Sequence, residues 1–141
     1  MSLVRDILQR RDLFYVEEGD SVAVVARRMM ELGVGAIVVM GAGGLRGVFS
    51  ERDLMRRVVL EGRDPQRTAV HEVMTTSLAT IEDSATVEQA MEAMELHGCR
   101  HLPVMSGRTV AGFLSMRDVM HHELARKTEE LHHMKAYIHG T

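Results

Sequence analysis

The sequence predicts an α/β fold made of two copies of one β-α-β-β-α unit, followed by an extended C-terminal helix. Two observations support this prediction. The chain matches itself at a shift of 65 residues, which aligns residues 33–40 with 98–105 and residues 47–53 with 112–118 without a gap. Helical periodicity then continues beyond the second copy. Because one unit alone would leave its apolar face exposed, the two copies are expected to pack together.

Each copy is expected to begin with a short strand followed by a helix. The strands are predicted from apolar stretches at residues 13–16 and residues 78–81. The helices start at Ser21 and Thr86, because hydroxyl side chains accept hydrogen bonds from free N–H groups at a helix start. Apolar residues then recur at three- and four-residue spacings. Gly33 and Gly98 are expected to end these helices.

Two strand-like runs follow in each copy and predict an antiparallel hairpin. They cover residues 36–40 and 45–49 in the first copy, and residues 101–105 and 110–114 in the second. A further helix is expected to begin at Ser50 and at Ser115, and the second of these extends to about Ile138. The predicted organisation is a first repeat at residues 1–61, a linker at 62–68, a second repeat at 69–124 and a helical extension at 125–141.

Composition excludes several classes of protein. No stretch of the 141 residues approaches the roughly 20 apolar residues of a membrane span, and the charged N-terminus does not resemble a secretory signal, so a cytoplasmic protein is expected. A net charge of -3 and an aromatic content of 4% argue against a nucleic-acid binder. The arginine pairs, Arg56-Arg57 among them, are interpreted as solvated faces.

Neither a metal site nor an enzyme is predicted. The single cysteine, Cys99, has no second thiol beside it, and adjacent histidines such as His121 and His122 point about 100° apart on a helix. They therefore do not form the i, i+4 pair that chelates zinc. The sequence also lacks a P-loop and a combination of nucleophile and base, so no catalytic residue and no obligatory cofactor are expected.

The most specific motif is Gly-h-h-Ser-x-Arg-Asp, where h is apolar, and both copies contain it. Its serine and aspartate are Ser50 and Asp53 in the first copy and Ser115 and Asp118 in the second. One interpretation is a helix cap, in which the hydroxyl and the carboxylate bind free N–H groups. The other is a ligand site, because a carboxylate can accept both hydroxyls of a ribose. The glycines Gly47 and Gly112 would then let a ligand approach the strand closely.

This motif, together with the segment Arg100-His101-Leu102-Pro103-Val104, resembles tandem cystathionine β-synthase (CBS) domains, also called a Bateman module. The resemblance covers residues 4–124. It implies that the two repeats pack sheet to sheet as a pseudo-twofold pair. It also implies two clefts that bind adenosine-containing ligands such as AMP, ADP, ATP, NAD or S-adenosylmethionine, and a regulatory function.

The resemblance further implies that each cleft takes its ribose contacts from one repeat and part of its base pocket from the first strand of the other. Ser50 and Asp53 would then face residues 78–81, and Ser115 and Asp118 would face residues 13–16. The residues expected around the base are Leu78, Thr80, Ile81 and Pro103, with the close-approach glycines Gly47 and Gly112.

Phosphate groups need cations at some distance from the aspartates, because like charges repel. Arg100 and His101 are the candidates, although a solvated strand end and a neutral histidine are equally consistent with the sequence. The matching positions in the first copy, Gly35 and Ala36, bear no charge. The cleft that contains Asp53 is therefore predicted to be the better nucleotide site.

Two functions remain open at this stage. The first is an adenine-nucleotide sensor for AMP, ADP, ATP or NAD that forms a homodimer and acts in trans on an unidentified effector protein. The second is a constitutive dimerisation or protein-interaction module with vestigial ligand clefts.

Overall fold

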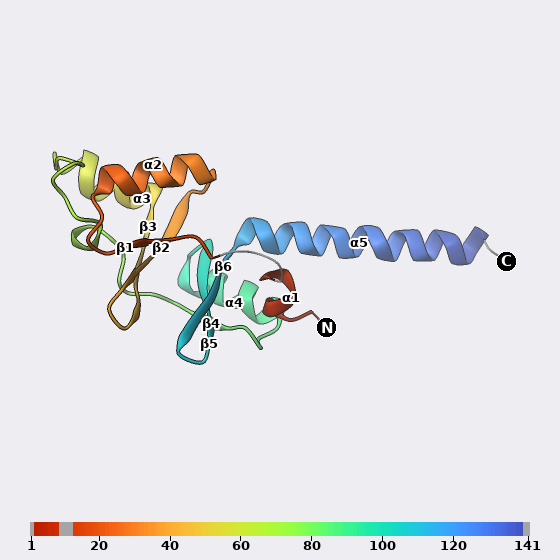
Figure 1. Cartoon of the computed structure of the whole chain (residues 1–141). Helices are drawn as coiled ribbons and strands as arrows, with labels where there is room; N and C mark the ends of the chain where they lie inside the picture. The colour runs from red at the N-terminus through yellow and green to blue at the C-terminus, as the bar shows by residue number, and fades with distance from the viewer. Residues whose placement is uncertain (1, 9–12, 140–141) are drawn as a thin grey trace.

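The computed structural model describes residues 2–8 and 13–139, and the predicted order of elements is confirmed in both copies (Figure 1). The first copy consists of β1 (Tyr15–Glu17), α2 (Val22–Leu32), β2 (Ala36–Gly41), β3 (Gly44–Ser50), α3 (Glu51–Asp53) and the π-helical turn η1 (Leu54–Val59). The second consists of β4 (Ile81–Glu82), α4 (Val87–His97), β5 (His101–Ser106), β6 (Thr109–Ser115) and α5 (Met116–His139). A short helix, α1 (Val4–Leu8), and a 3-10 turn, η2 (Val70–Glu72), precede the two copies.

Each copy forms a three-stranded sheet, and the two sheets have the same register. β1 runs parallel to β2, which pairs antiparallel with β3, and β4, β5 and β6 repeat this arrangement. Val39 lies opposite Gly47 and Val104 opposite Gly112, and both registers shift at the next residue of the middle strand. β1 and β4 are shorter than the apolar stretches that predict them, because each pairs with only a few residues of its neighbour.

The helix ends follow from local sequence signals, as predicted. The Ser21 hydroxyl caps α2, while Thr86 and Gln89 form a reciprocal capping box at the start of α4. Gly33 and Gly98 end these helices with φ angles of 67° and 62°, in the left-handed region that glycine adopts without steric cost.

Two apolar cores fill the molecule, and each takes a segment from the other half of the chain. α1 contributes Val4 to the second core, and the Val4 N–H donates to the carbonyl oxygen of Ala85 at 2.8 Å. The segment around η2 contributes Val70 and Met74 to the first core. Residues 69–75, which the sequence assigns to the second repeat, therefore pack on the first. Burying a valine fully stabilises a fold by about 1.5–3 kcal/mol, so this exchange binds the two halves together.

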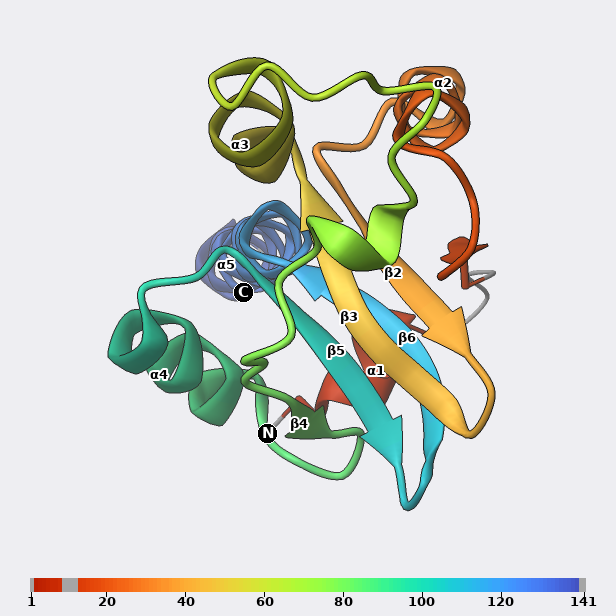
Figure 2. The same ribbon diagram turned by 90° about the vertical axis from the view of Figure 1, so that its left-hand side faces the viewer.

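The two sheets meet through β3 and β6, which contact each other. Figure 2 shows α2 and α3 on one side of the paired sheets and α4 on the other. The sheet-to-sheet packing of the two repeats is thus confirmed. The cleft described below lies where segments of both repeats come together.

Helix α5 projects from the body of the molecule (Figure 1). Its first residues pack on the second core through Val119, and every described side chain at residues 127–138 is exposed. Within residues 2–8 and 13–139, no helix combines the length and the apolar character that a membrane crossing requires.

Candidate functional site

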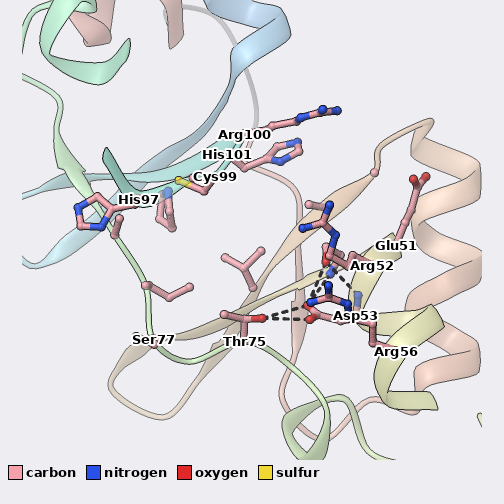
Figure 3. Close-up of a pocket in the computed structure, with 18 of the residues that line it drawn as sticks. Glu51, Arg52, Asp53, Arg56, Thr75, Ser77, His97, Cys99, Arg100 and His101 are labelled. Atoms are coloured by element: carbon pink, nitrogen blue, oxygen red, sulfur yellow. Dashed lines mark hydrogen bonds between the residues drawn. The ribbon is translucent and has the colours of Figure 1, made fainter. Parts of the chain in front are cut away.

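A cleft of about 800 Å³ lies between the two repeats (Figure 3). One wall comes from β2, β3, α3 and η1 of the first repeat. The opposite wall comes from the chain at residues 75–79 and from residues 97–103, where α4 ends and β5 begins. The polar residues that line it are Ser50, Glu51, Arg52, Asp53, Arg56, Arg57, Thr75, Ser77, His97, Arg100 and His101. The cleft therefore brings together side chains that are separated in the sequence by up to about half of the chain length.

Asp53 is a buried carboxylate in the wall of the cleft, with 7% of its surface exposed. It accepts hydrogen bonds from the Ser50 backbone N–H and the Ser50 hydroxyl, both at 3.1 Å. The Thr75 hydroxyl donates to the same carboxylate at 3.1 Å, and the Arg57 guanidinium lies 3.9 Å away. The Ser50 hydroxyl in turn accepts from the Asp53 N–H at 3.2 Å. The helix cap that the motif predicts is present, and its free face turns to the cleft.

The cleft is rich in arginine. Four arginines line it, Arg52, Arg56, Arg57 and Arg100, against two carboxylates. Arg57 also donates to the carbonyl oxygen of Met74 at 2.8 Å and so anchors the exchanged segment. Among the described residues, no group of three or more His, Cys, Asp or Glu side chains is placed to hold a metal ion. The electrostatics of the cleft therefore favour an anion.

Arg56 and Arg57 are exposed, as the interpretation of a solvated face expects, but they also belong to the candidate site. Both side chains line the cleft. They follow Asp53 by three and four residues, a spacing that keeps side chains on one side of a helix. Their spacing from Asp53 is thus a sequence signal that could have identified them as residues of the cleft.

His101 begins β5 and lies at the end of the cleft formed by the second repeat. Its ring stacks on Phe113, with the ring centroids 5.1 Å apart and the planes 20° from parallel. Burial lowers the pKa of His101 below its ordinary value; the carboxylates of Asp118 and Glu51 act in the opposite direction, and the Arg100 guanidinium adds to the lowering. Its surroundings therefore favour the neutral imidazole more strongly than water does.

This lowered pKa predicts that the wild-type chain loses stability on acidification more steeply than His101→Phe. The unfolded chain, in which the histidine has its ordinary pKa of 6.5, takes up the proton first. The free energy of unfolding therefore falls as the pH drops through about 6.5 and levels off below the lowered folded-state pKa. Phenylalanine keeps a ring on Phe113 and does not titrate. Thermal midpoints measured from about pH 8 to pH 5 test this, and equal slopes for both chains would refute it.

The second copy of the motif forms the same cap but lies outside this cleft. The Ser115 N–H donates to the Asp118 carboxylate at 3.0 Å, and the Asp118 N–H donates to the Ser115 hydroxyl at 3.0 Å. Of the segment predicted to face them, Val16 is buried in the first core, and Phe14 and Tyr15 are 43% and 48% exposed.

The structure divides the residues predicted around the nucleotide into two groups. Six of them line the cleft: Ser50, Asp53, Leu78, Arg100, His101 and Pro103. Thr80 and Ile81 do not, although they belong to the same predicted stretch as Leu78. Ile81 instead lies in β4 and packs against the second core.

Gly47 and Gly112 have a different function from the predicted close approach of a ligand. A Cβ atom on Gly47 would lie 2.7 Å from the carbonyl oxygen of Thr75 and 2.6 Å from the sulfur of Met74. A Cβ atom on Gly112 would lie 2.8 Å from a methyl group of Leu8. The space beside each glycine is thus filled by another segment of the chain, and neither glycine lines the cleft.

Sequence reasoning missed Thr75, Ser77 and His97 as lining residues. Thr75 precedes the second copy's first strand, and it reaches Asp53 only because residues 69–75 pack on the first repeat. No local pattern signals this contact. His97 is the last residue of α4, where the chain turns into the cleft wall, and helix periodicity alone does not predict that placement.

Comparison with known proteins identifies the family. Residues 4–60 and 70–125 each match the family model described as the CBS domain. The chain is 33% identical over 126 residues to "CBS domain-containing protein CBSX3, mitochondrial" of Arabidopsis thaliana, a match that covers 86% of this chain and 61% of that relative's length.

Two solved structures show the same fold. A putative signal-transduction protein with CBS domains from Burkholderia ambifaria MC40-6 matches with a TM-score of 0.82 at 32% identity, over 88% of this chain and 95% of that one. The crystal structure of CBSX2 in complex with AMP matches with a TM-score of 0.77 at 24% identity, over 90% and 99% of the two chains. With two matched regions that span most of its length, this chain belongs to the CBS domain family.

Proposed function

We propose that this chain is a regulatory module whose inter-repeat cleft binds an adenine nucleotide, namely AMP, ADP, ATP or NAD. One observation supports this most directly: a buried carboxylate, Asp53, shares a cleft with four arginines and His101. A nucleotide needs both groups, an acceptor for its ribose hydroxyls and cations for its phosphates. The AMP complex of CBSX2, which has the same fold, also supports the proposal.

The ribose hydroxyls would donate to the Asp53 carboxylate. In the free protein its oxygens accept from the hydroxyls of Ser50 and Thr75. A hydroxyl group rotates and can both donate and accept, so each can turn toward the ligand and free a lone pair on the carboxylate. Charge-assisted hydrogen bonds of this kind are about twice as strong as neutral ones.

The base and the phosphates would contact different residues of the cleft. Leu78 and Pro103 offer apolar surface to the base. Arg100 and His101 of the second repeat, with the arginines of α3 and η1, would hold the phosphates, and the planar guanidinium fork suits phosphate oxygens.

A ligand in this cleft would regulate by favouring one arrangement of the two repeats. Both repeats line the cleft, so a nucleotide binds best to the arrangement that brings Asp53 and Arg100 to the right separation. Binding shifts the population only as far as the affinities for the two arrangements differ. We propose that an effector protein, bound in trans by a homodimer of this chain, distinguishes these arrangements, and that the chain itself is not catalytic.

The proposal predicts that adenine nucleotides raise the thermal midpoint. A ligand that binds only the folded state stabilises it by about 2.7 kcal/mol at 100 times its dissociation constant. The measurement is a thermal-shift series with AMP, ADP, ATP and NAD, with ribose 5-phosphate and CMP as controls for the phosphate and for the base. No shift with any adenine nucleotide at millimolar concentration would contradict the proposal.

A second candidate function, a constitutive interaction module with vestigial clefts, is favoured by the exposed apolar residues of α5. Leu124, Leu131 and Ile138 are each more than half exposed, on a helix whose described side chains at residues 127–138 are all exposed. This function predicts an oligomeric state that nucleotides do not change, together with no thermal shift. The thermal-shift series with AMP distinguishes the two functions, because only the sensor is stabilised by the nucleotide.

A further inference from the structure

The distal part of α5 exposes its side chains to solvent. Arg126 holds the base of the helix by ion pairs to Glu88 of α4 and to Glu123, at 3.9 and 3.7 Å. Beyond this point every described side chain at residues 127–138 is exposed, and Figure 1 shows the helix extending away from both repeats. Because most of the stability of a helix in a protein comes from packing of its apolar face, this exposed segment would be stabilised by a surface to pack on.

Apolar residues follow α5 at the alternating spacing of four and three residues that is typical of a coiled coil. In heptad terms, the a positions are Leu124, Leu131 and Ile138, and the d positions are Met120, Lys127 and Met134. The five apolar members are all between 58% and 67% exposed. They form one stripe, interrupted only at Lys127, along a helix that is otherwise polar, and such a stripe is the surface on which a second helix packs.

The charged residues beside this stripe indicate which helix packs on it and in which direction. Glu130 is at a g position and Lys135 at the following e position. In a parallel pair of identical helices, Glu130 of each copy lies beside Lys135 of the other, which gives two attractive pairs. In an antiparallel pair, Glu130 would face Glu130 of the second copy, and His121 would face Lys135. Charge complementarity therefore favours a second copy of this chain in the parallel direction.

Lys127 interrupts the stripe at a single position, and this sets the register. A lone polar residue in a coiled-coil core lowers stability but specifies register and the number of strands. With the two helices in register, Lys127 faces only Lys127, and the two ammonium groups can extend to solvent along the stems of the side chains. A shift of one heptad would bury each lysine against apolar residues of the second copy.

We propose that residues 120–138 of α5 pair with the same residues of a second copy as a parallel, in-register, two-stranded coiled coil. This interaction surface is separate from the nucleotide cleft. It places the two modules of the dimer at the same end of the coil.

Disulfide cross-linking of the full chain tests direction and register together. In a Cys99→Ser background, Met134→Cys puts the only thiol at a d position, where parallel in-register helices bring two equivalent residues face to face. Ala136→Cys is the matched control, because it lies at an f position on the outer side. Mild oxidation is expected to give a covalent dimer with Met134→Cys and none with Ala136→Cys. If a covalent dimer forms only when Leu124→Cys chains are mixed with Met134→Cys chains, the helices are antiparallel. If sedimentation equilibrium shows a monomer, the helices do not pair. Either result overturns the proposal.

Charge reversal provides a second test that does not depend on a thiol. Glu130→Lys and Lys135→Glu each create like-charge pairs across the coil and are expected to raise the dimer dissociation constant several-fold. The double variant is expected to restore it, although it still lacks the ion pair between Arg126 and Glu130 within one helix. Additive losses in the double variant would refute the parallel pairing. Neither measurement involves a nucleotide, so its result is independent of the proposed nucleotide binding.

Discussion

Asp53→Asn is expected to lower the affinity for an adenine nucleotide by about 10- to 100-fold, because hydrogen bonds to a charged group contribute about 1.5–3 kcal/mol. Asparagine has nearly the same shape and keeps an oxygen that can accept from Ser50 or Thr75. It loses the negative charge that would strengthen two hydrogen bonds from the ribose. Asp118→Asn is the matched control, because Asp118 forms the same cap with Ser115 but lies outside the cleft.

Isothermal titration calorimetry with AMP on the wild-type chain and the two variants measures this effect. Thermal midpoints of the ligand-free variants show whether each retains its fold, since both substitutions alter a helix cap. Unchanged affinity in Asp53→Asn, together with a loss in Asp118→Asn, would mean that the nucleotide binds at the other copy of the motif.

Gly47→Ala is expected to destabilise the fold by about 1–3 kcal/mol, the usual cost of forcing an extra carbon into a packed site. The new methyl group would lie 2.7 Å from the Thr75 carbonyl oxygen, which belongs to the backbone and pairs with Val48. Gly112→Ala is the matched control at the equivalent position of the second sheet. Its methyl group would meet only side-chain atoms of Leu8, which can rotate away, so a smaller loss is expected.

Urea unfolding of both glycine variants tests this order of stability, with the slope of the transition checked against the wild-type chain. Equal losses of unfolding free energy in Gly47→Ala and Gly112→Ala would show that the backbone at Thr75 moves as easily as the side chain of Leu8. Because Thr75 lines the cleft and its hydroxyl would turn toward the bound ribose, its displacement in Gly47→Ala should also weaken AMP binding. Gly112→Ala should leave binding unchanged.

The two copies of the motif differ in the residues that surround them. Both form the serine–aspartate cap, but only the first is followed by two arginines, Arg56 and Arg57, at positions where the second has His121 and His122. Arg100 and His101 of the second repeat complete the arginine-rich cleft from the opposite side. The asymmetry predicted from the sequence at Gly35 and Ala36 is thus accompanied by a second difference on the helix.

Features that depend on neighbours in the chain were predictable from the sequence. The caps at Ser21 and Thr86, the left-handed ends at Gly33 and Gly98 and the paired hairpins all involve residues a few positions apart. The repeat itself is visible because the same local signals recur at a constant spacing. Six of the residues predicted around the ligand line one cleft, and α3 and β5 place Asp53, His101 and Pro103 among them by regular geometry.

The sequence by itself therefore determined the number of repeats, the order of their elements and the Ser-x-x-Asp cap. Only the tertiary structure decided that residues 69–75 pack on the first repeat, that Thr75 donates to Asp53, and that Gly47 and Gly112 make room for the chain rather than for a ligand. The physical reason is that these contacts depend on how two apolar cores are shared between the halves. Burial of Val4 and Val70 drives that exchange, and no periodicity within either segment indicates which core will accept it.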